Sequence, residues 1–146
     1  MILQNILSTK GSVVHTISPG VMLDEVAHKL VEHRIGALLV TRQGSAGGQE
    51  LLGIVTERDI LYHCAKSNLP LAAVEVTTVM SSPLTTALPS DTVEQVMGLM
   101  TAKRIRHVPV LAEGLLIGII SIGDLVKAQF NNLAMENRFM KDYISS

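Results

Sequence analysis

The chain has 146 residues, of which 47% are hydrophobic and 3% aromatic, and its formal net charge is −1. That length accommodates one compact domain or two small modules that share a core, and it is too short for a large multidomain enzyme. The near-zero charge and the lack of tryptophan remove the electrostatic and stacking features on which nucleic-acid binding depends. Cys64 is the single cysteine, so no internal disulfide forms and we expect a reducing, cytoplasmic location.

The mean hydropathy of +0.36 raises the question of a membrane span. A span needs about 20 consecutive apolar residues, and the longest aliphatic stretches, at residues 35–40 and 115–120, are far shorter. The first ten residues lack the charged start and the long apolar run of a signal peptide. We expect no membrane partner, and we expect the apolar surface of so lightly charged a chain to be covered in an oligomer.

The second half of the chain repeats the first. Residues 19–26 (PGVMLDEV) align with residues 89–96 (PSDTVEQV) at an offset of 70. Further along, residues 53–61 (GIVTERDIL) align with residues 118–126 (GIISIGDLV) at an offset of 65. The difference falls in a glycine-rich loop at residues 41–50, which is shorter in the second copy. The chain therefore contains two copies of one unit.

Each copy is predicted to fold as β-α-β-β-α. In the first copy, a short strand at residues 13–17 precedes an amphipathic helix. Strands at residues 37–41 and 51–55 follow, and a second helix begins directly at Thr56. The apolar face of the first helix comprises Leu23, Val26, Ala27, Leu30 and Val31.

In the second copy, the short strand is predicted at residues 84–88. We expect Asp91 to begin the next helix, with Glu94 completing a capping box. Strands at residues 107–111 and 115–120 then lead into a helix that begins at Ser121. The alternation predicts a small α/β (α+β) unit, and two such units pack with pseudo-twofold symmetry. The apolar face of the first helix comprises Val93, Val96, Met97 and Met100.

A helical pattern continues from Asp124 to the end of the chain. One interpretation is packing on the chain's own core, and the other is a helix–helix contact between subunits, where one polar residue sets the register. Because the stripe extends past the repeat, the sequence favours the subunit contact and a homodimer. The stripe consists of Val126, Phe130, Leu133, Met140 and Ile144 at i, i+4, i+7, i+14 and i+18, with Asn137 at i+11.

These patterns divide the chain into five segments, with helical extensions at both ends. They are an N-terminal extension at residues 1–12, a first repeat at 13–68, a linker at 69–82, a second repeat at 83–127 and a C-terminal helix at 128–146.

The doubled pattern closely resembles a CBS domain pair, or Bateman module. The resemblance covers residues 13–126, and its motifs are GIVTERD at 53–59, GIISIGD at 118–124, MSSP at 80–83 and RIRHVPV at 104–110. It implies a stand-alone regulatory module that binds an adenine nucleotide such as AMP, ADP, ATP or NAD and senses energy or redox state. Such a module acts on a regulated protein through a conformational change. The alternative is a structural or protein-interaction module whose nucleotide clefts are vestigial.

Two pairs, Thr56 with Asp59 and Ser121 with Asp124, have two interpretations. A hydroxyl at the N-cap and an acid three residues later form a capping box, worth about 1 kcal/mol to the helix. The helix N-terminus can also attract an anion while the carboxylate accepts ribose hydroxyls. Recurrence at equivalent places favours a pair of binding sites, and the resemblance implies that these four residues contact an adenosyl ligand. Capping and binding can coexist.

The segment from Lys103 to His107 is basic. Lys103 and Arg104 are explained by the negative end of a helix dipole. Arg106 and His107, at the start of the following strand, are better explained by phosphate binding, and the resemblance gives the same role to this segment, Arg104 included. The first copy has RIGA at residues 34–37 instead, so the two sites are predicted to differ.

Arg58 is either a solvent-exposed residue of the first helical turn or a cation that compensates for the missing ones in the first copy. Two segments, Gly36-Ala37 and Val108-Pro109, would let a flat base approach the backbone closely, as glycine permits. The resemblance implies that two further segments, His15-Thr16 and Ser82-Pro83, contact adenine through backbone groups. Ordinary strand and turn structure is the strong alternative for these candidates.

The remaining reactive side chains show no catalytic or metal-binding pattern. The histidines and Cys64 lack the spacing of metal ligands, and no nucleophile or phosphate-loop motif is present. We expect Cys64 to pack as a small apolar residue on a helix, and His28 and His33 to lie on the surface. The sequence thus predicts neither enzymatic activity nor a catalytic cofactor.

Overall fold

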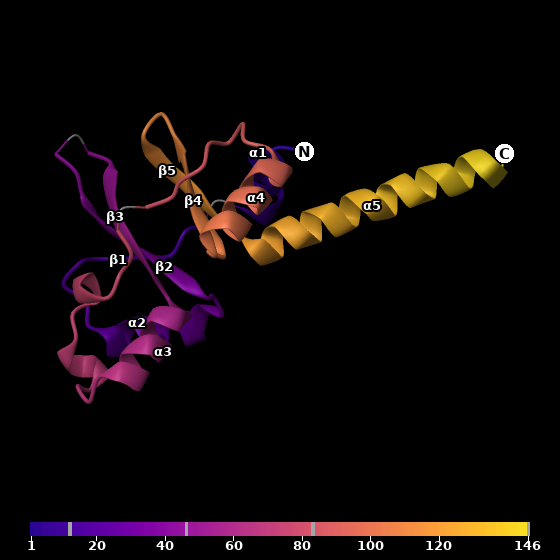
Figure 1. The fold of residues 1–146 in the computed structure, drawn as a ribbon. Coiled ribbons are helices and arrows are strands. Elements are labelled where there is room, and N and C mark those ends of the chain that lie inside the picture. The colour runs from indigo at the N-terminus through magenta and orange to yellow at the C-terminus, as the bar shows by residue number, and fades with distance from the viewer. Residues whose placement is uncertain (12, 46, 83, 146) are drawn as a thin grey trace.

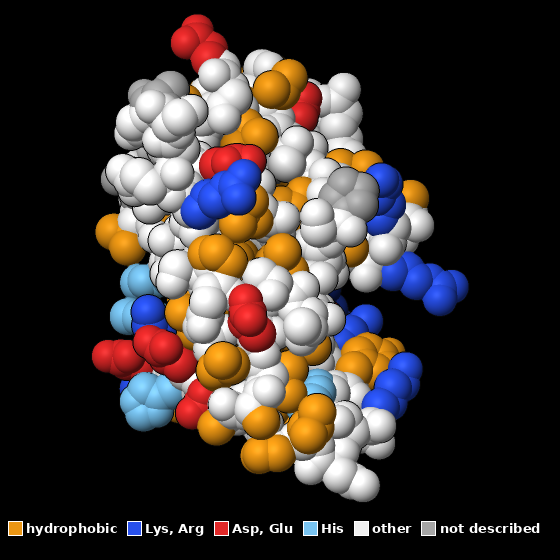
Figure 2. Space-filling model, turned by 90° about the vertical axis from the view of Figure 1, so that its left-hand side faces the viewer, with side chains coloured by type: hydrophobic (Ala, Val, Ile, Leu, Met, Phe, Trp, Pro, Cys, Tyr) orange, Lys and Arg blue, Asp and Glu red, His pale blue; other side chains and the backbone are white. Residues whose placement is uncertain are grey.

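Each repeat forms a small α/β lobe, and a long helix projects from the second lobe away from the rest of the molecule (Figure 1). The computed structural model describes residues 1–11, 13–45, 47–82 and 84–145. In the view of Figure 2, acidic, basic and hydrophobic side chains are interspersed, so this face carries no field of a single sign. Within the described ranges, no helix combines the length and hydrophobicity that a membrane span requires.

The first lobe contains a three-stranded sheet covered by two helices. β1 runs parallel to β2, and β2 pairs antiparallel with β3. The two predicted long strands are confirmed, and they extend further into the glycine-rich loop than the sequence suggested. The short strand expected at residues 13–17 forms only over its last two residues. In chain order the elements are β1 (Thr16–Ile17), α2 (Leu23–His33), β2 (Ala37–Gln43), β3 (Gln49–Thr56) and α3 (Glu57–Lys66).

The second lobe repeats this arrangement with a smaller sheet. The strand predicted at residues 84–88 is wrong, because only Ala87 pairs there, in an isolated parallel bridge to Val110. That bridge is the counterpart of the pairing between Ile17 and Val40 in the first lobe. The elements are α4 (Val93–Lys103), β4 (His107–Ala112), β5 (Leu115–Ser121) and α5 (Ile122–Ser145), and β4 pairs antiparallel with β5.

The capping box predicted for α4 lies one residue too early in the sequence. Thr92, not Asp91, is the N-cap, and its hydroxyl accepts a hydrogen bond from the Gln95 N–H at 3.1 Å. In return, the Gln95 side-chain oxygen Oε1 accepts the Thr92 N–H at 2.9 Å. The Asp91 carboxylate instead accepts the Leu88 N–H at 2.8 Å. Asp91 therefore closes the turn before the helix, which leaves the capping position to Thr92.

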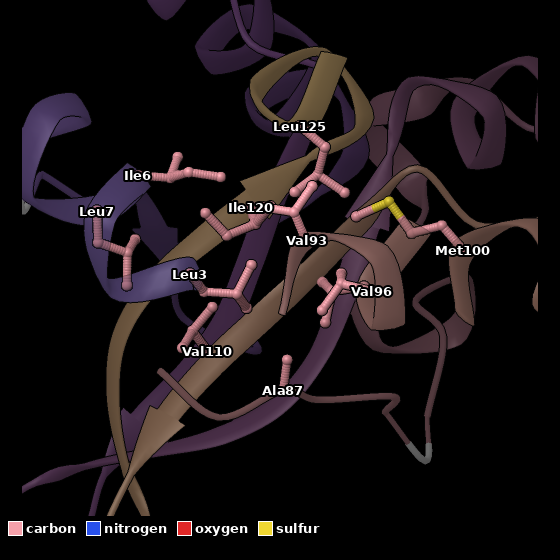
Figure 3. Close-up of a cluster of buried hydrophobic side chains, with 11 residues drawn as sticks. Leu3, Ile6, Leu7, Ala87, Val93, Val96, Met100, Val110, Ile120 and Leu125 are labelled. Carbon is pink, nitrogen blue, oxygen red and sulfur yellow. The ribbon is translucent and has the colours of Figure 1, made fainter. Parts of the chain in front are cut away.

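The N-terminal helix α1 (Leu3–Lys10) is part of the second lobe's core. Leu3, Ile6 and Leu7 lie in one buried cluster with residues of α4, β4 and β5, as Figure 3 shows. The Leu3 N–H donates to the Asp91 carbonyl at 3.0 Å, and the Val93 N–H donates to the Met1 carbonyl at 3.1 Å. These contacts join the start of the chain to the start of α4.

The segment between the repeats packs into the core of the first lobe in the same way. It forms two short 3₁₀ turns, at Leu71–Ala73 and Val76–Thr78. The Leu23 N–H donates to the Val74 carbonyl at 2.9 Å, and Val74 and Val76 are buried in the first lobe's core. The segment that precedes each repeat in the sequence therefore packs on the other repeat.

The glycine that opens each repeated motif lies where these segments cross the sheet. A Cβ on Gly118 would come within 2.6 Å of Leu7 Cδ2 in α1. A Cβ on Gly53 would come within 2.5 Å of Met80 Sδ and 3.0 Å of the Ser81 carbonyl oxygen. The close approach of a second segment explains why both motifs begin with glycine.

The two lobes meet through a third apolar cluster. Ala37, Leu39 and Ile54 of the first lobe pack there against side chains that include Leu116 and Ile119 of the second. Because the lobes contact each other through their sheets, the end of β3, which leads into α3, lies near the start of β4, which follows α4.

Two predictions of burial are wrong. Val31, expected on the apolar face of α2, is 79% exposed, because the core of the first lobe receives only the stripe of Leu23, Val26 and Leu30. Cys64, expected to pack on its helix, is also exposed. None of the residues of α3 is buried, so this helix lies at the rim of the lobe.

Candidate functional site

A cleft of about 270 Å³ opens between the lobes and is lined by residues of both. We call it the first cleft. The sequence analysis singled out eight of its residues: Gly36, Thr56, Arg58, Asp59, Arg104, Arg106, His107 and Pro109. The other six are Ile54, Glu57, Ser81, Leu84, Thr85 and Ile105.

The acidic side of the first cleft is the start of α3. Thr56 ends β3 and is the N-cap, so its hydroxyl accepts the Asp59 N–H at 3.3 Å. The Asp59 carboxylate accepts the Thr56 N–H at 2.8 Å and the Thr56 hydroxyl at 3.1 Å, both through Oδ2. The capping interpretation is therefore correct, and it fixes the carboxylate in place at the cleft wall.

The basic side of the first cleft comes from the second repeat. Helix α4 ends at Arg104, which adopts a left-handed conformation with φ of 54°. The Ile105 N–H then donates back to the Met100 carbonyl at 3.0 Å, which closes the helix end and turns the chain toward β4. This turn brings Arg104 and Arg106 to the same cleft as Arg58 of the first repeat. Three guanidinium groups thus border one cleft.

His107 lies where the two repeats touch. Its Cε1 is 3.3 Å from the position that a Cβ on Gly36 would occupy, so only glycine leaves room for the ring without displacement. Burial lowers the pKa of His107 below its ordinary value, although the charge of Glu57 opposes the shift. His107 is therefore neutral at pH 7, and the arginines carry the positive charge of the cleft.

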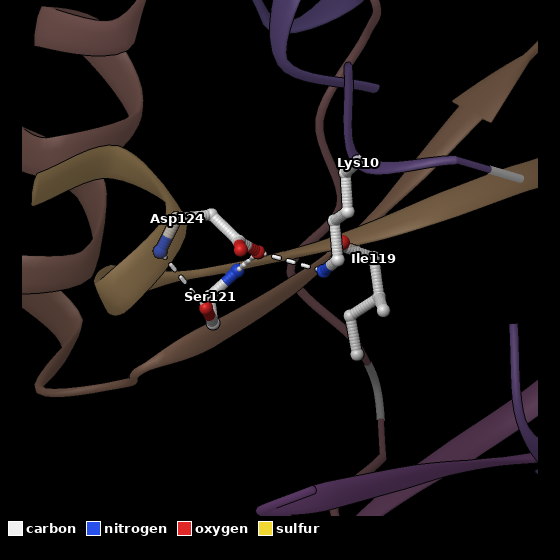
Figure 4. A network of polar contacts seen from close by, with 4 residues as sticks. All are labelled: Lys10, Ile119, Ser121 and Asp124. Atoms are coloured by element: carbon white, nitrogen blue, oxygen red, sulfur yellow. Dashed lines mark hydrogen bonds and ion pairs between the residues drawn. The ribbon is translucent and has the colours of Figure 1, made fainter. Parts of the chain in front are cut away.

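The equivalent pair of the second repeat, Ser121 and Asp124, has a different environment (Figure 4). Both backbone caps recur: Asp124 accepts the Ser121 N–H at 2.9 Å, and Ser121 Oγ accepts the Asp124 N–H at 3.1 Å. Here, however, Lys10 Nζ at the end of α1 lies 2.7 Å from Asp124 Oδ2 and donates to the Ile119 carbonyl at 2.8 Å. In the described part of the chain, no cation forms such an ion pair with Asp59.

The Lys10 ammonium group changes the titration of Asp124. Partial burial raises the pKa of this carboxyl group, but hydrogen bonds from Lys10 and from the Ser121 N–H outweigh it, so the pKa lies below its ordinary value. Asp124 is therefore ionised at neutral pH and already paired. It also borders a groove of about 500 Å³ between α1 and α5, to which Lys10 and Lys127 contribute.

The ring of His15 also makes a contact within the chain. Its ring stacks on that of His33, with 3.9 Å between the centroids and 17° between the planes. His15 is the counterpart, at the offset of 70, of Thr85, which lines the first cleft. His33 is exposed, as predicted, and so is His28.

Four other predicted residues, Ala37, Val108, Thr16 and Ser82, do not line the first cleft. The side chains of Ala37 and Val108 are buried in apolar clusters, so only their backbone can reach a ligand. Thr16 belongs to β1 and pairs with Leu39, while the side chain of Ser82 is exposed. Pro83 lies outside the described residues.

Sequence reasoning missed six residues of the cleft, which are of two kinds. Ile54, Glu57 and Ile105 are sequence neighbours of predicted residues, so the motif boundaries alone could have included them. Ser81 lies within the MSSP motif at residues 80–83, and Leu84 and Thr85 follow it directly, so their signal was their position in or next to that motif. Among the described residues, no group of three or more histidine, cysteine or acidic side chains could hold a metal ion.

Comparisons with known proteins agree with the doubled architecture. The CBS domain family matches residues 8–66 and 76–131, once on each repeat. The CBS domain-containing protein CBSX3, mitochondrial, from Arabidopsis thaliana is 34% identical over 139 residues, which are 94% of this chain and 66% of that protein. The matched part is thus just under two thirds of that relative's length.

Solved structures show the same fold. The crystal structure of the CBS-domain containing protein ATU1752 from Agrobacterium tumefaciens superposes with a TM-score of 0.82 at 39% identity, covering 88% of this chain and 99% of that one. The CBS domain pair of MJ0100, crystallised with 5′-methylthioadenosine and S-adenosyl-L-methionine, gives a TM-score of 0.75 at 22% identity. It covers 90% of this chain and 98% of that one, and at this identity the likeness concerns the fold.

Proposed function

Because the chain belongs to the CBS domain family, we propose that its first cleft binds an adenosine-containing ligand of the AMP, ADP, ATP or NAD class. The observation that carries this proposal is the meeting of one ordered carboxylate, Asp59, with three arginines in a cleft that both repeats build. A nucleotide offers the matching groups, since its ribose hydroxyls are donors and its phosphates are anions. The ligands of MJ0100 support the proposal only in that the same fold accommodates adenosine compounds.

The proposal gives each side of the first cleft its own role. Asp59 accepts the ribose hydroxyls, and Thr56 with the N-terminus of α3 adds polar contacts to ribose or phosphate. Arg58, Arg104 and Arg106 attract the phosphates. The base packs among the apolar side chains on the cleft wall, which are Ile54, Leu84 and Pro109.

We further propose that one ligand binds per chain. The carboxylate of Asp124, which corresponds to Asp59, is already paired with Lys10. A ribose would have to displace that ammonium group, and the basic segment of the second repeat lies at the first cleft instead.

In this proposal the chain is a regulatory, non-catalytic sensor of energy or redox state in the cytoplasm, working as a homodimer on a regulated protein. A ligand that contacts both repeats favours the arrangement of lobes that it fits best, and this shift is the signal. The MSSP segment and the CBS motifs in both repeats support a binding role.

The test is calorimetric titration of the full chain with AMP, ATP, NAD and S-adenosylmethionine in parallel, after bound nucleotide has been removed. We expect at least one ligand to bind with a stoichiometry near one. In the Asp59→Asn variant, affinity should fall at least tenfold, because an amide no longer accepts from both ribose hydroxyls but still caps Thr56.

Asp124→Asn is the matched control, since it makes the same change at the equivalent place of the other repeat. We expect this variant to leave the affinity of the first cleft for the ligand unchanged. Equal losses in both variants would contradict the assignment of the first cleft. No binding by any ligand, in titration or thermal shift, would favour the alternative function, a protein-interaction module with vestigial clefts.

A further inference from the structure

Helix α5 leaves the body of the protein halfway along its length. Leu125 is fully buried, and Ala128, Gln129 and Asn132 are partly buried against the second lobe. Every residue from 133 to 144 is exposed. Figure 1 shows this half of the helix extending away from both lobes. An exposed helical segment of this length is marginal in water by itself, so additional packing would stabilise it.

The exposed side of α5 carries a heptad pattern. Val126, Phe130, Leu133, Asn137, Met140 and Ile144 follow one another at steps of four, three, four, three and four. The apolar members of this stripe are between 54% and 78% exposed. Steps alternating between three and four make an average of 3.5 residues, the repeat of a left-handed coiled coil. We call these six residues the α5 seam.

The α5 seam does not compete with the body of the protein for the same face. The residues that contact the second lobe (125, 128, 129 and 132) are offset from the seam around the helix. Asp124, Lys127, Ala128 and Asn131 face the groove toward α1. The seam is therefore available without any rearrangement of the lobes.

We propose that the α5 seam binds the same seam of a second copy of this chain, in a parallel, in-register, two-stranded coiled coil. The proposal specifies the interface of the homodimer proposed above, and it does not depend on nucleotide binding. The coiled coil extends from Val126 to Ile144, about 28 Å at 1.5 Å per residue.

Asn137 argues for the parallel orientation. With Leu133 and Met140 at d positions, Asn137 occupies an a position. In a parallel dimer, a positions face each other, so the two Asn137 amides can hydrogen-bond across the seam. In an antiparallel dimer, a faces d, and each amide would be buried against an apolar side chain at a desolvation cost.

The flanking charges argue for a second copy as the partner. Glu136 occupies a g position and Lys141 the following e position. In a parallel dimer, g of one helix lies beside the following e of its partner, so Glu136 meets Lys141 twice, once on each side. The chain is thus complementary to itself in charge, in addition to its apolar seam. Met135 and Phe139, which are also exposed, lie outside the seam at f and c positions.

The first test is sedimentation of the full chain and of two charge-insertion variants. Leu133→Glu places a charge in the seam, whereas Phe139→Glu makes the same insertion on the outer face. Both side chains are exposed in the single chain, 57% and 74%, so neither substitution removes a core contact. We expect the wild type and Phe139→Glu to sediment with equal mass, and Leu133→Glu with half that mass. A wild type that stays monomeric, or a Leu133→Glu variant that keeps the wild-type mass, would overturn the proposal.

The second test addresses orientation. In a Cys64→Ser background, Asn137→Cys should form an intermolecular disulfide on mild oxidation, because in a parallel dimer these two positions face each other. Asn131→Cys is the matched control, an asparagine on the side of α5 that faces α1, and it should not cross-link. Cross-linking of Asn131→Cys alone would disprove the seam.

A charge swap tests the pairing of Glu136 with Lys141. Glu136→Lys and Lys141→Glu should each weaken dimerisation roughly fivefold, and the double variant should restore it. Additive losses in the double variant would exclude the parallel register. None of these measurements involves a nucleotide, so they separate failure of this proposal from failure of the nucleotide proposal.

Discussion

Asp59 and Asp124 are the same residue type at the same place in two repeats, yet their surroundings differ. Both carboxylates accept the N–H of the capping residue three positions earlier, at 2.8 and 2.9 Å. Only Asp124 has an ammonium group beside it, because α1 ends at Lys10 on that lobe. The fold therefore leaves Asp59 at the wall of the first cleft without an ion-pair partner among the described residues, whereas Asp124 is paired with Lys10.

Removing the Lys10 ammonium group should make the free energy of unfolding less sensitive to pH in the acidic range. The pKa of Asp124 is lower in the folded protein than its ordinary value of 3.8, so its ionised form stabilises the fold above that value. This stabilisation is lost as the pH falls through the folded pKa. For Lys10→Met we expect a free energy of unfolding lower by roughly 0.5–1 kcal/mol at pH 7, with the difference shrinking below about pH 4.

Urea unfolding of the wild type and Lys10→Met between pH 7 and pH 3 measures this effect. Lys127→Met is the control, since Lys127 lines the same groove but forms no ion pair with the described acidic residues. A constant difference between wild type and Lys10→Met across the pH range would disprove the linkage to Asp124.

Among the helices and segments, α1 and the linker each pack on the lobe of the repeat that they do not directly precede. Leu3 of α1 is fully buried among residues of the second repeat, although it precedes the first repeat in the sequence. Val74 and Val76 of the linker are buried in the first lobe. The two repeats therefore complete each other's cores, and neither lobe corresponds to one continuous stretch of chain.

Truncating a core side chain of α1 should destabilise the whole protein. For Leu3→Ala we expect a loss of about 2–5 kcal/mol, the range for a buried leucine whose removal leaves a cavity. Gln4→Ala, at the next and exposed position, should change the stability by less than about 0.5 kcal/mol. Chemical unfolding followed by circular dichroism compares the two. Equal and small effects would mean that α1 is not part of the core in solution.

At the scale of the whole molecule, the first cleft exists only because the repeats pack together. Its carboxylate comes from the start of α3 and two of its arginines from the end of α4, some 45 residues further along the chain. The contact between Gly36 and His107 joins the same two regions. A ligand in this cleft touches both lobes at once, which is the physical requirement for a signal that depends on their arrangement.

A substitution in the second repeat should therefore weaken the binding of a phosphorylated nucleotide whose ribose is held by Asp59 of the first repeat. For Arg106→Gln we expect affinity for ATP to fall about tenfold, because a charge-assisted hydrogen bond to phosphate is worth about 1.5–3 kcal/mol. Affinity for adenosine, which has no phosphate, should not change. Lys103→Gln, a substitution on the same basic segment outside the cleft, is the control in parallel titrations. A loss of adenosine binding in Arg106→Gln would contradict the phosphate role.

The repeat, the order of the main elements and the start of α3 could be predicted from local sequence, because each depends on neighbours within a few residues. Periodicity identifies Leu23, Val26 and Leu30 as the buried stripe of α2 but wrongly adds Val31 to it, and the hydroxyl of Thr56 followed three residues later by Asp59 marks the start of α3. The same local rule was wrong by one residue at Asp91. Two adjacent polar residues can cap the helix there, and the Asp91 carboxylate is used in the preceding turn, so Thr92 is the N-cap. It also failed at residues 84–88, where strand pairing depends on a distant partner.

Which residues share a cleft depends on how the two lobes pack and could not be predicted from local sequence. Thr56 and Asp59 line the same cleft as Arg104 and Arg106, and not only with Arg58 of their own repeat, because the lobes pack sheet to sheet. The pairing of Lys10 with Asp124 likewise follows from the crossing of α1 onto the second lobe. Contacts between residues far apart in sequence are set by how the apolar faces fit together. No local pattern contains that information, which is why two nearly identical motifs have different environments.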